Sequence, residues 1–340
     1  MSDRSPARFV VGGYGSALGA VTLTDDGFGS PDDVALAERP SCVIVSPDGR
    51  FAYAVLENAV GAVAAWAVSP TGSWQPLGEQ PTGGADPAHL ALSPDGRWLV
   101  AANYTSGSVC VHPVRCDGSL GARTDLVQHE GPLGPVSDRQ DGPHAHQVVF
   151  VAQDVILVCE LGLDLVITYR IDLAGGLLTE LSRAALTPGT GPRHLVLSAD
   201  GHEAYVVGEL SSTVTTCRFD GIDLQPGVSA STRLPGETRQ NTPAGIVLSA
   251  SGDSVMVSNR GDDTLAEVEV EGTDLRLDEV VSCGGQQPRW LALGPEKDQL
   301  LVANQGSDRV TVLRRGPGGW AATGGFAWPA PTCLALLPSA

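Results

Sequence analysis

The feature that most constrains the fold is a short turn phrase that recurs along most of the chain. SPDGR occupies residues 46–50 and 93–97, SADGH occupies 198–202, and SASGD occupies 249–253. Degenerate copies are VAQD at 151–154 and GPEK at 294–297, so successive copies lie 45 to 58 residues apart. Asp-Gly and Ser-Gly pairs between apolar runs are typical of hairpin turns, because glycine adopts positive φ at little steric cost. This period predicts a repeat architecture rather than two unrelated domains.

Apolar runs of strand length flank each turn. The first run lies between a proline and the turn, as in CVIVS (42–46) and HLVLS (194–198), and it is almost wholly apolar. A second run follows the turn, as in WLVAAN (98–103), and a third follows a short polar loop, as in GSVCVHPV (107–114). The first strand is therefore expected to be covered on both faces, whereas the alternating third strand should face water on one side.

Units of about 45 residues with three or four strands predict an all-β fold, a β-propeller. First strands begin near residues 41, 88, 146, 193, 244 and 289, and the apolar run after Pro331 supplies a seventh. The segment RFVVGGYGSALGAVTLT (8–24) has the pattern of a second and third strand without a first. The simplest arrangement joins these N-terminal strands to the C-terminal inner strand in one blade, which leaves no edge exposed. We therefore predict one seven-bladed domain over residues 1–340; six or eight blades would require one phrase to be spurious.

Composition bounds the partners and the compartment. The chain has 42 glycines and 24 prolines, which suits short strands joined by turns. Its net charge is −18, so its surface should repel nucleic-acid phosphate and anionic membrane, and we expect neither as a partner. The seven cysteines include no CxxC pair, which favours buried thiols in a reducing compartment over a disulfide framework or a zinc site. The N-terminus lacks an apolar signal region, and no apolar run is long enough to span a membrane, so we predict a cytoplasmic location.

Antiparallel pairing should bring two sets of residues to one mouth of the central channel. The start of each first strand and the end of each second strand lie on the same face of the ring. The first set follows the prolines and consists of Ser41, Ala88, His144, Arg193, Ala244, Arg289 and Thr332. The second set ends the second strands and consists of Glu57, Asn103, Glu160, Glu209, Asn259 with Arg260, and Gln305. The second set is polar in every copy although the strands before it are apolar, which indicates a shared opening.

The third repeat departs from the pattern. Pro143 lies eight residues before its turn rather than six, and the two extra residues fall in HAHQ (144–147). We expect this insertion to move an imidazole out of strand register toward the mouth, since bulges re-aim side chains near sites. Both His144 and His146 remain candidates.

The residues that the sequence most favours as catalytic are His146, Arg193, Glu209 and Arg260. Two arginines in so acidic a protein need an anionic counterpart, and a guanidinium binds carboxylate or phosphate through two parallel hydrogen bonds. A carboxylate beside an imidazole supplies general acid–base capacity near neutral pH. The same strand-end argument makes His144, Asn103, Arg289 and Gln305 candidates for substrate binding. For several strand-end residues a structural role is the competing interpretation, namely Glu57, Asn103, Glu160 and Gln305. We expect His89 to be a structural or surface residue, and for His194 we favour packing.

These phrases resemble the seven-bladed lactonase family. The matching segments are GPHAHQVVF (142–150), GPRHLVLSADGHEAYVVGELSSTV (191–214), SNRGDDTLAEVEV (258–270), and QPRWLALG (287–294) with LLVANQGSDRV (300–310). They run in family order from about residue 8 to the C-terminus. The family includes propeller-type bacterial 6-phosphogluconolactonases and fungal carboxy-muconate lactonizing enzymes. The resemblance implies a site of His146, or His144, with Arg193, Glu209 and Arg260.

The sequence also departs from that family. Gly208 stands where asparagine usually precedes the glutamate, Gly245 where an acidic residue is usual, and Gln147 where serine is usual. None of these changes removes the four proposed residues, but Gly208 and Gly245 would alter the pocket and leave the substrate open.

The first hypothesis is therefore a lactone hydrolase of the 6-phosphogluconolactonase type that acts on a small anionic lactone or sugar acid. Arg193 and Arg260 would hold the anionic group and stabilise the oxyanion, Glu209 would act as general base, and His146 would orient the substrate or protonate the ring oxygen. We expect no cofactor and no metal, and a monomer or homodimer. Two alternatives stay open. One is a cycloisomerase that forms or opens a lactone, and the other is a non-catalytic interaction scaffold.

Overall fold

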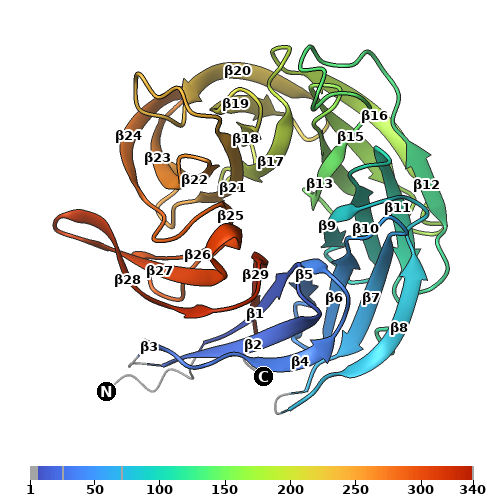
Figure 1. The fold of residues 1–340 in the computed structure, drawn as a ribbon. Helices are drawn as coiled ribbons and strands as arrows, with labels where there is room; N and C mark the ends of the chain where they lie inside the picture. Colours follow the sequence, from blue (N-terminus) through green and yellow to red (C-terminus); the bar gives the residue numbers. More distant parts are fainter. Residues whose placement is uncertain (1–6, 25–26, 70–71, 339–340) are drawn as a thin grey trace.

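Seven antiparallel sheets stand around a central axis in the computed structural model, which describes residues 7–24, 27–69 and 72–338 (Figure 1). Apart from one 3-10 turn, η1 (Gln305–Ser307), the regular structure of the described residues is β-strand. The prediction of an all-β, seven-bladed propeller is confirmed. Among the same residues, none forms a helix that is both long and apolar enough to cross a membrane.

Six blades contain four strands each, in chain order from the axis to the rim. We number the blades by their inner strands. Blade 1 is β5 (Pro40–Val45), β6 (Phe51–Leu56), β7 (Ala62–Ala67) and β8 (Gln75–Pro81), and blade 2 is β9 (Pro87–Leu92), β10 (Trp98–Asn103), β11 (Ser108–Pro113) and β12 (Asp125–Gln128). Blade 3 is β13 (Ala145–Phe150), β14 (Val155–Glu160), β15 (Leu165–Ile171) and β16 (Leu178–Ala185), and blade 4 is β17 (Pro192–Leu197), β18 (Glu203–Gly208), β19 (Thr213–Phe219) and β20 (Leu224–Ser231). Blade 5 is β21 (Thr242–Leu248), β22 (Ser254–Arg260), β23 (Thr264–Glu271) and β24 (Asp274–Ser282), and blade 6 is β25 (Pro288–Leu293), β26 (Gln299–Asn304), β27 (Arg309–Gly316) and β28 (Gly319–Ala327).

Blade 7 closes the ring with strands from both ends of the sequence. Its inner strand is β29 (Pro331–Leu337), which pairs with β1 (Arg8–Gly13), and β1 pairs with β2 (Ala17–Thr24). Two short strands, β3 (Gly27–Phe28) and β4 (Asp32–Leu36), both pair with β2. The pairing places Val10 opposite Ala335, more than 300 residues later in the chain. Blue and red strands lie side by side there (Figure 1), so the predicted mode of closure is confirmed.

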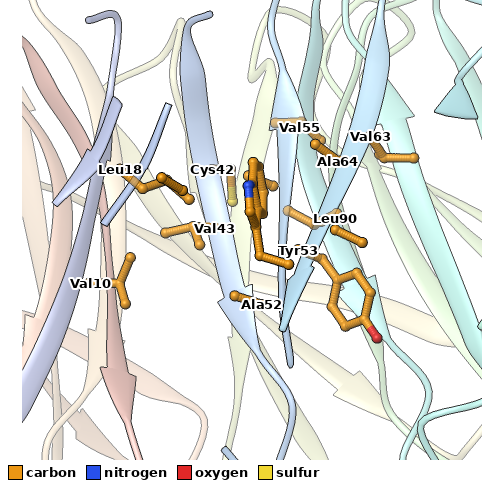
Figure 2. Packing of buried hydrophobic residues seen from close by; sticks show 14 of the residues in the cluster. Val10, Leu18, Cys42, Val43, Ala52, Tyr53, Val55, Val63, Ala64 and Leu90 are labelled. Carbon is orange, nitrogen blue, oxygen red and sulfur yellow. The ribbon is translucent and has the colours of Figure 1, made fainter. Parts of the chain in front are cut away.

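The apolar cores lie between neighbouring blades. Val100 and Ala102 of blade 2 share a core with Val148 and Ile156 of blade 3, and similar clusters follow around the ring. The largest cluster joins blade 7, blade 1 and blade 2, and Figure 2 shows part of it around Tyr53. Each blade therefore stabilises its neighbours, and the closing blade contributes to two of these interfaces.

The expectation that the third strands face water on one side was wrong. In blade 2, β11 is buried along its whole length except at Pro113, and β7 is buried at its four central residues. The fourth strands instead carry the exposed positions, as β8 and β20 show. A sheet packed between two others buries both faces of its third strand, so the alternation in sequence reflects polar but buried side chains such as His112.

The recurrent turn phrase forms one hydrogen-bonded unit on the face opposite the strand ends that carry the candidate site. In blade 2, Ser93 Oγ donates to Asp95 Oδ1 at 2.7 Å and accepts from the backbone N–H of Trp98 at 3.0 Å. Gly96 adopts a φ of +71° between them, which explains the glycine of the phrase. Blades 1 and 4 repeat the unit through Ser46 with Asp48 and through Ser198 with Asp200.

Candidate active site at the mouth of the channel

Each inner strand carries a bulge at its start. In blade 6, Pro288 pairs with Asn304 and Trp290 pairs with Ala303, so Arg289 is an extra residue without a partner on the second strand. The same shift in register occurs at the start of the other inner strands. A bulge redirects the side chain of the extra residue. The bulge positions of blades 1 to 7 are Ser41, Ala88, His146, Arg193, Ala244, Arg289 and Thr332.

His146, and not His144, therefore occupies the repeated position in blade 3. Ala145 pairs with Glu160 and Gln147 pairs with Cys159, so Ala145 takes the place that proline has in the other blades. Placing His144 in the first set was wrong, because the two extra residues precede the strand. The bulge itself is common to the blades and does not result from the insertion.

His144 lies in the loop before β13 and packs on Tyr104. Its ring stacks on the Tyr104 ring with centroids 4.6 Å apart. Its Nδ1 lies 3.1 Å from the Tyr104 carbonyl oxygen, and its Nε2 lies 3.0 Å from Asp141 Oδ1. Both ring nitrogens therefore have protein partners, and the substrate-binding role of His144 stays a prediction.

The predicted second set mixes two positions. Residues that pair with the starts of the inner strands include Asn103, Glu160, Asn259 and Asn304. The position that follows them is occupied, in blades 1 to 7, by Glu57, Tyr104, Leu161, Glu209, Arg260, Gln305 and Tyr14. Glu57, Glu209, Arg260 and Gln305 were thus placed correctly by the repeat, whereas Asn103 and Glu160 lie one residue too early.

Asn103 and Glu160 are engaged inside the protein. The fully buried Asn103 amide donates to Ser108 Oγ at 3.1 Å, and Asn304 makes the same kind of bond to Thr311. Glu160 is also fully buried and binds His129 Nδ1 and the backbone N–H of His144. These contacts favour the structural interpretation for both residues, and the substrate-binding role of Asn103 stays a prediction.

The centre of the site is Glu209 with three arginines. Its Oε2 lies 2.8 Å from Arg193 Nε and 2.7 Å from Arg260 Nη2, and its Oε1 contacts Arg139 Nη2. Arg193 and Glu209 are almost fully buried. The sequence argument brought Arg193, Glu209 and Arg260 together. It missed Arg139, which lies on the loop between β12 and β13 and belongs to no repeated phrase.

A second polar group adjoins the first. The Tyr14 hydroxyl donates to Glu57 Oε1 at 2.8 Å. The Arg39 guanidinium lies 4.4 Å from the centre of the Tyr14 ring, and that of Arg289 lies 5.4 Å from it. Burial, with the nearby Glu57, raises the pKa of Tyr14 to about 12 although Arg289 opposes the shift. The hydroxyl is therefore neutral, and Tyr14 could have been found by extending the strand-end position into blade 7.

Aromatic rings from four blades meet across the axis. His194 of blade 4 contacts His146 of blade 3, His89 of blade 2 and Trp290 of blade 6, with centroid distances of 5.2, 5.5 and 5.6 Å. His194 Nε2 also lies 3.3 Å from Arg193 Nη1. These contacts agree with the packing role expected for His194, and of the two alternatives for His89, structural or surface, they favour the structural one.

Gly245 of blade 5 lies against the same aromatic group. A Cβ at Gly245 would stand 2.8 Å from the Leu291 backbone nitrogen, beside Trp290. The position therefore has no room for a larger side chain in this arrangement. The backbone of Trp290 and Leu291 in the neighbouring blade occupies the space that the acidic side chain usual in the family would need.

Positive charge dominates the site. Burial alone would raise the pKa of Glu209, but Arg260, Arg193 and Arg139 outweigh it and bring the value to about 2. Burial and the charges of Arg193, Arg289 and Arg260 hold the pKa of His146 well below its usual range. Glu209 is thus ionised and His146 is neutral at physiological pH.

The arginines outnumber the carboxylates in this cluster. Arg139, Arg193, Arg260 and Arg289 lie near Glu209 and Glu57, and Arg39 adjoins Tyr14. Burial and the neighbouring Arg260 and Arg289 lower the pKa of Arg193, because guanidiniums this close repel one another. Arginine nevertheless stays protonated in proteins, so an anionic ligand would relieve the repulsion.

Other predicted features are placed as follows. Gln305 lies in η1, partly buried, and its substrate-binding role stays a prediction. All seven cysteines are free thiols, six of them buried. In the described residues, no group of three or more His, Cys, Asp or Glu side chains is arranged to hold a metal ion. The cytoplasmic location and the oligomeric state also stay predictions.

Comparison with known proteins places this architecture in context. A family model described as "Lactonase, 7-bladed beta-propeller" matches residues 10–335. The structure of a periplasmic gluconolactonase from Pseudomonas aeruginosa superposes with a TM-score of 0.92, at 32% identity over 98% of this chain and 99% of that chain. A putative 6-phosphogluconolactonase from Bacteroides fragilis gives a TM-score of 0.88 at 27% identity, over 99% of each chain. The 6-phosphogluconolactonase of Bacillus subtilis is 29% identical over 292 residues, 84% of this chain and 82% of its own length.

Proposed function

Since this chain belongs to the lactonase family of seven-bladed β-propellers, we propose that it hydrolyses the lactone of a sugar acid, with 6-phosphogluconolactone as the first candidate substrate. The observation that carries the proposal is the convergence of three arginines on Glu209, next to a neutral imidazole, at the strand ends on one face of the ring. Water attack on a lactone carbonyl creates an oxyanion, and guanidinium groups stabilise such a charge in a site that excludes water.

The charge of the site supports a substrate that carries an anionic group. The relatives named above act, by their names, on gluconolactone or on 6-phosphogluconolactone. An excess of guanidiniums in a protein of net charge −18 favours the phosphorylated lactone, because a neutral sugar would leave the excess uncompensated.

The contacts change the roles expected from the sequence. A carboxylate with a pKa of about 2 and both oxygens held by arginines is a weak base, so we assign Glu209 to positioning the guanidiniums. Two of the same arginines also weaken His146 as a base, but its buried Nδ1 has no hydrogen-bond partner among the described residues and is free to accept a proton, whereas both Glu209 oxygens contact arginines, so we assign the general-base role to His146. In this scheme, His146 takes a proton from the water that attacks the carbonyl carbon. It then returns this proton to the ring oxygen as the single bond between the carbonyl carbon and the ring oxygen breaks.

The test is a proton-release assay against the spontaneous background, with δ-6-phosphogluconolactone, glucono-δ-lactone and a muconolactone as substrates. We expect acceleration on the sugar lactones, with the phosphorylated one preferred. His146→Gln and Arg193→Gln should each lower kcat/KM by about 10²–10³-fold. The matched control is His202→Gln, because His202 is exposed on a turn of the opposite face.

Two outcomes would contradict the proposal. If no lactone is hydrolysed faster than background, the site does not act as a lactonase. If only the muconolactone reacts, the chemistry is that of a lactone-forming or lactone-opening isomerase instead.

A further inference from the structure

The loop of residues 129–144, between β12 and β13, brings one cation into the site from outside the repeated strands. We propose that this cation, Arg139, is a specificity-determining residue that binds the anionic group of the substrate directly. The inference rests on the proposed lactone hydrolysis and deepens it, because it assigns selection between phosphorylated and plain lactones to a single loop residue.

Arg139 differs from the other arginines that contact Glu209. The side chains of Arg193 and Arg260 are 2% and 11% exposed, whereas that of Arg139 is 31% exposed. Arg139 is therefore the member of the group that an incoming ligand meets most readily. Its position suits contact with a substituent that lies away from the reacting carbonyl.

The guanidinium of Arg139 has donors to spare. Its Nη2 contacts Glu209 Oε1 and lies 3.3 Å from the Tyr104 hydroxyl. In the described part of the chain, Nε and Nη1 of Arg139 have no hydrogen-bond partner. A planar guanidinium held at one nitrogen can donate from the other two to a phosphate or carboxylate. Glu209 thus orients Arg139 without occupying it.

Hydrogen bonds hold the loop of residues 129–144 in place. The adjacent Gln140 is almost fully buried, and its Nε2 donates to the Leu161 carbonyl at 2.9 Å. Its Oε1 accepts from the backbone N–H of Val136 at 3.0 Å, and the Gly134 N–H donates to the Gly162 carbonyl at 3.0 Å. These bonds tie the loop to the turn that follows β14. A cation positioned in this way loses little conformational entropy on binding an anion.

Charge balance gives a further reason for this assignment. Arg193 and Arg260 already exceed the single negative charge of Glu209. The third guanidinium adds a charge that the local carboxylates do not need, at a cost in repulsion that a bound anion offsets. A residue that served only to neutralise Glu209 would not be required here.

The test compares Arg139→Gln with the wild-type protein on δ-6-phosphogluconolactone and glucono-δ-lactone. We expect KM for the phosphorylated lactone to rise about 10–100-fold, as for the loss of hydrogen bonds between charged groups, with kcat changed less than about threefold. For the plain lactone, kcat/KM should fall at least tenfold less than for the phosphorylated lactone. Arg139→Lys, which keeps the charge, should recover part of the lost affinity. Arg170→Gln on the outer part of blade 3 is the control, since Asp154 is the one acidic partner of Arg170 among the residues that the structure describes.

Direct binding separates this inference from the proposed reaction. Titration calorimetry with 6-phosphogluconate should give at least tenfold weaker binding for Arg139→Gln than for wild type. A fall in kcat on both lactones with KM unchanged, or binding equal to wild type, would show that Arg139 acts only through Glu209 and would overturn the inference. A wild-type protein that binds 6-phosphogluconate through Arg139 but hydrolyses no lactone would instead refute the proposed function alone.

Discussion

At the scale of single residues, burial decides the ionisation of the site. Glu209 keeps its charge because three guanidiniums compensate for the loss of water, whereas His146, His194 and His89 lose theirs because burial and Arg193 act in the same direction. A carboxylate that is always charged and imidazoles that are always neutral make a site whose electrostatic state does not vary near neutral pH.

The neutral imidazoles have a measurable effect on stability. Burial and the charge of Arg193 lower the pKa of His89 to about 3. As pH falls below about 6.5, an unfolded chain binds a proton at this histidine and the folded protein does not. The free energy of unfolding should therefore drop by about 1.4 kcal/mol per pH unit for such a residue, and the loss should continue down to the folded pKa.

We predict that His89→Gln reduces the wild-type loss in free energy of unfolding between pH 7.5 and 5.5 by about 1.4 kcal/mol in total. Urea denaturation at both values gives the measurement, and His202→Gln, in an exposed turn, should retain the wild-type slope. Identical slopes for wild type and His89→Gln would contradict the assignment.

Glu209 causes a second decrease in the free energy of unfolding, in more acidic solution. Its lowered pKa stabilises the folded protein above about pH 4.3, and this contribution disappears as pH falls toward 2.

Arg193, Glu209, Arg260 and His146 could be predicted from the sequence because these residues occupy fixed points of a repeat. The repeat could not separate two adjacent positions, so Asn103 was included and Tyr104 was left out. Arg139 could not be predicted from the repeat, because the loop that carries it has no period. The approach of Arg139 to Glu209 depends on the tertiary contacts of Gln140.

At the scale of the element, the turn phrase is a hydrogen-bonded unit rather than a generic hairpin. Its serine hydroxyl bonds both the aspartate and the first backbone N–H of the second strand. This explains why Ser, Asp and Gly recur together while the residues between them vary. The same chemistry made the repeat visible in the sequence, and with it the number of blades.

Ser93→Ala tests this unit. The substitution removes three hydrogen bonds of a buried hydroxyl, one to Asp95 and two from the backbone N–H groups of Arg97 and Trp98, so we expect the free energy of unfolding to fall by about 1–2 kcal/mol. Catalytic constants should not change, because the turn lies on the face opposite the arginine cluster. Ser137→Ala, at an exposed position, provides the control for denaturation experiments. An effect no larger than that of the control would mean that the serine does not stabilise the turn.

The bulges at the inner strands are the elements that the sequence argument did not foresee in full. A proline followed by an apolar run predicts where each strand begins, and the structure adds one unpaired residue in each blade at that point. A register shift leaves no compositional mark, since Ser41, Ala88 and Arg289 occupy the same position. It was inferred for blade 3 alone, where an insertion drew attention to it.

At the scale of the whole molecule, stability depends on closing the ring. The pairing of β29 with β1 completes blade 7, and the cores on both sides of that blade depend on it. The sequence predicted this closure because the first and last segments each lack the strands that the other supplies.

Two leucines of β29 provide a matched test. Leu334 is 4% exposed and packs with Phe9 and Val11 of β1, whereas Leu336, two residues on, is 54% exposed. Leu334→Asp buries an unpaired charge and should lower the free energy of unfolding by more than about 3 kcal/mol. Leu336→Asp should change it by less than about 1 kcal/mol. Similar thermal denaturation midpoints for the two variants would show that the packing of β29 against β1 contributes little to the stability of the protein.

The closure of blade 7 also places polar residues next to the candidate site. Tyr14, which follows β1, and Thr332, at the start of β29, stand beside Glu57 and Ser41 of blade 1. During synthesis on the ribosome, a chain that has emerged only as far as blade 6 already holds Arg139, Arg193, Glu209 and Arg260, yet it has no inner strand with which to complete blade 7. The nascent protein therefore holds these charged groups before the propeller can close. We expect lactone hydrolysis to begin only once β29 has been synthesised and has paired with β1.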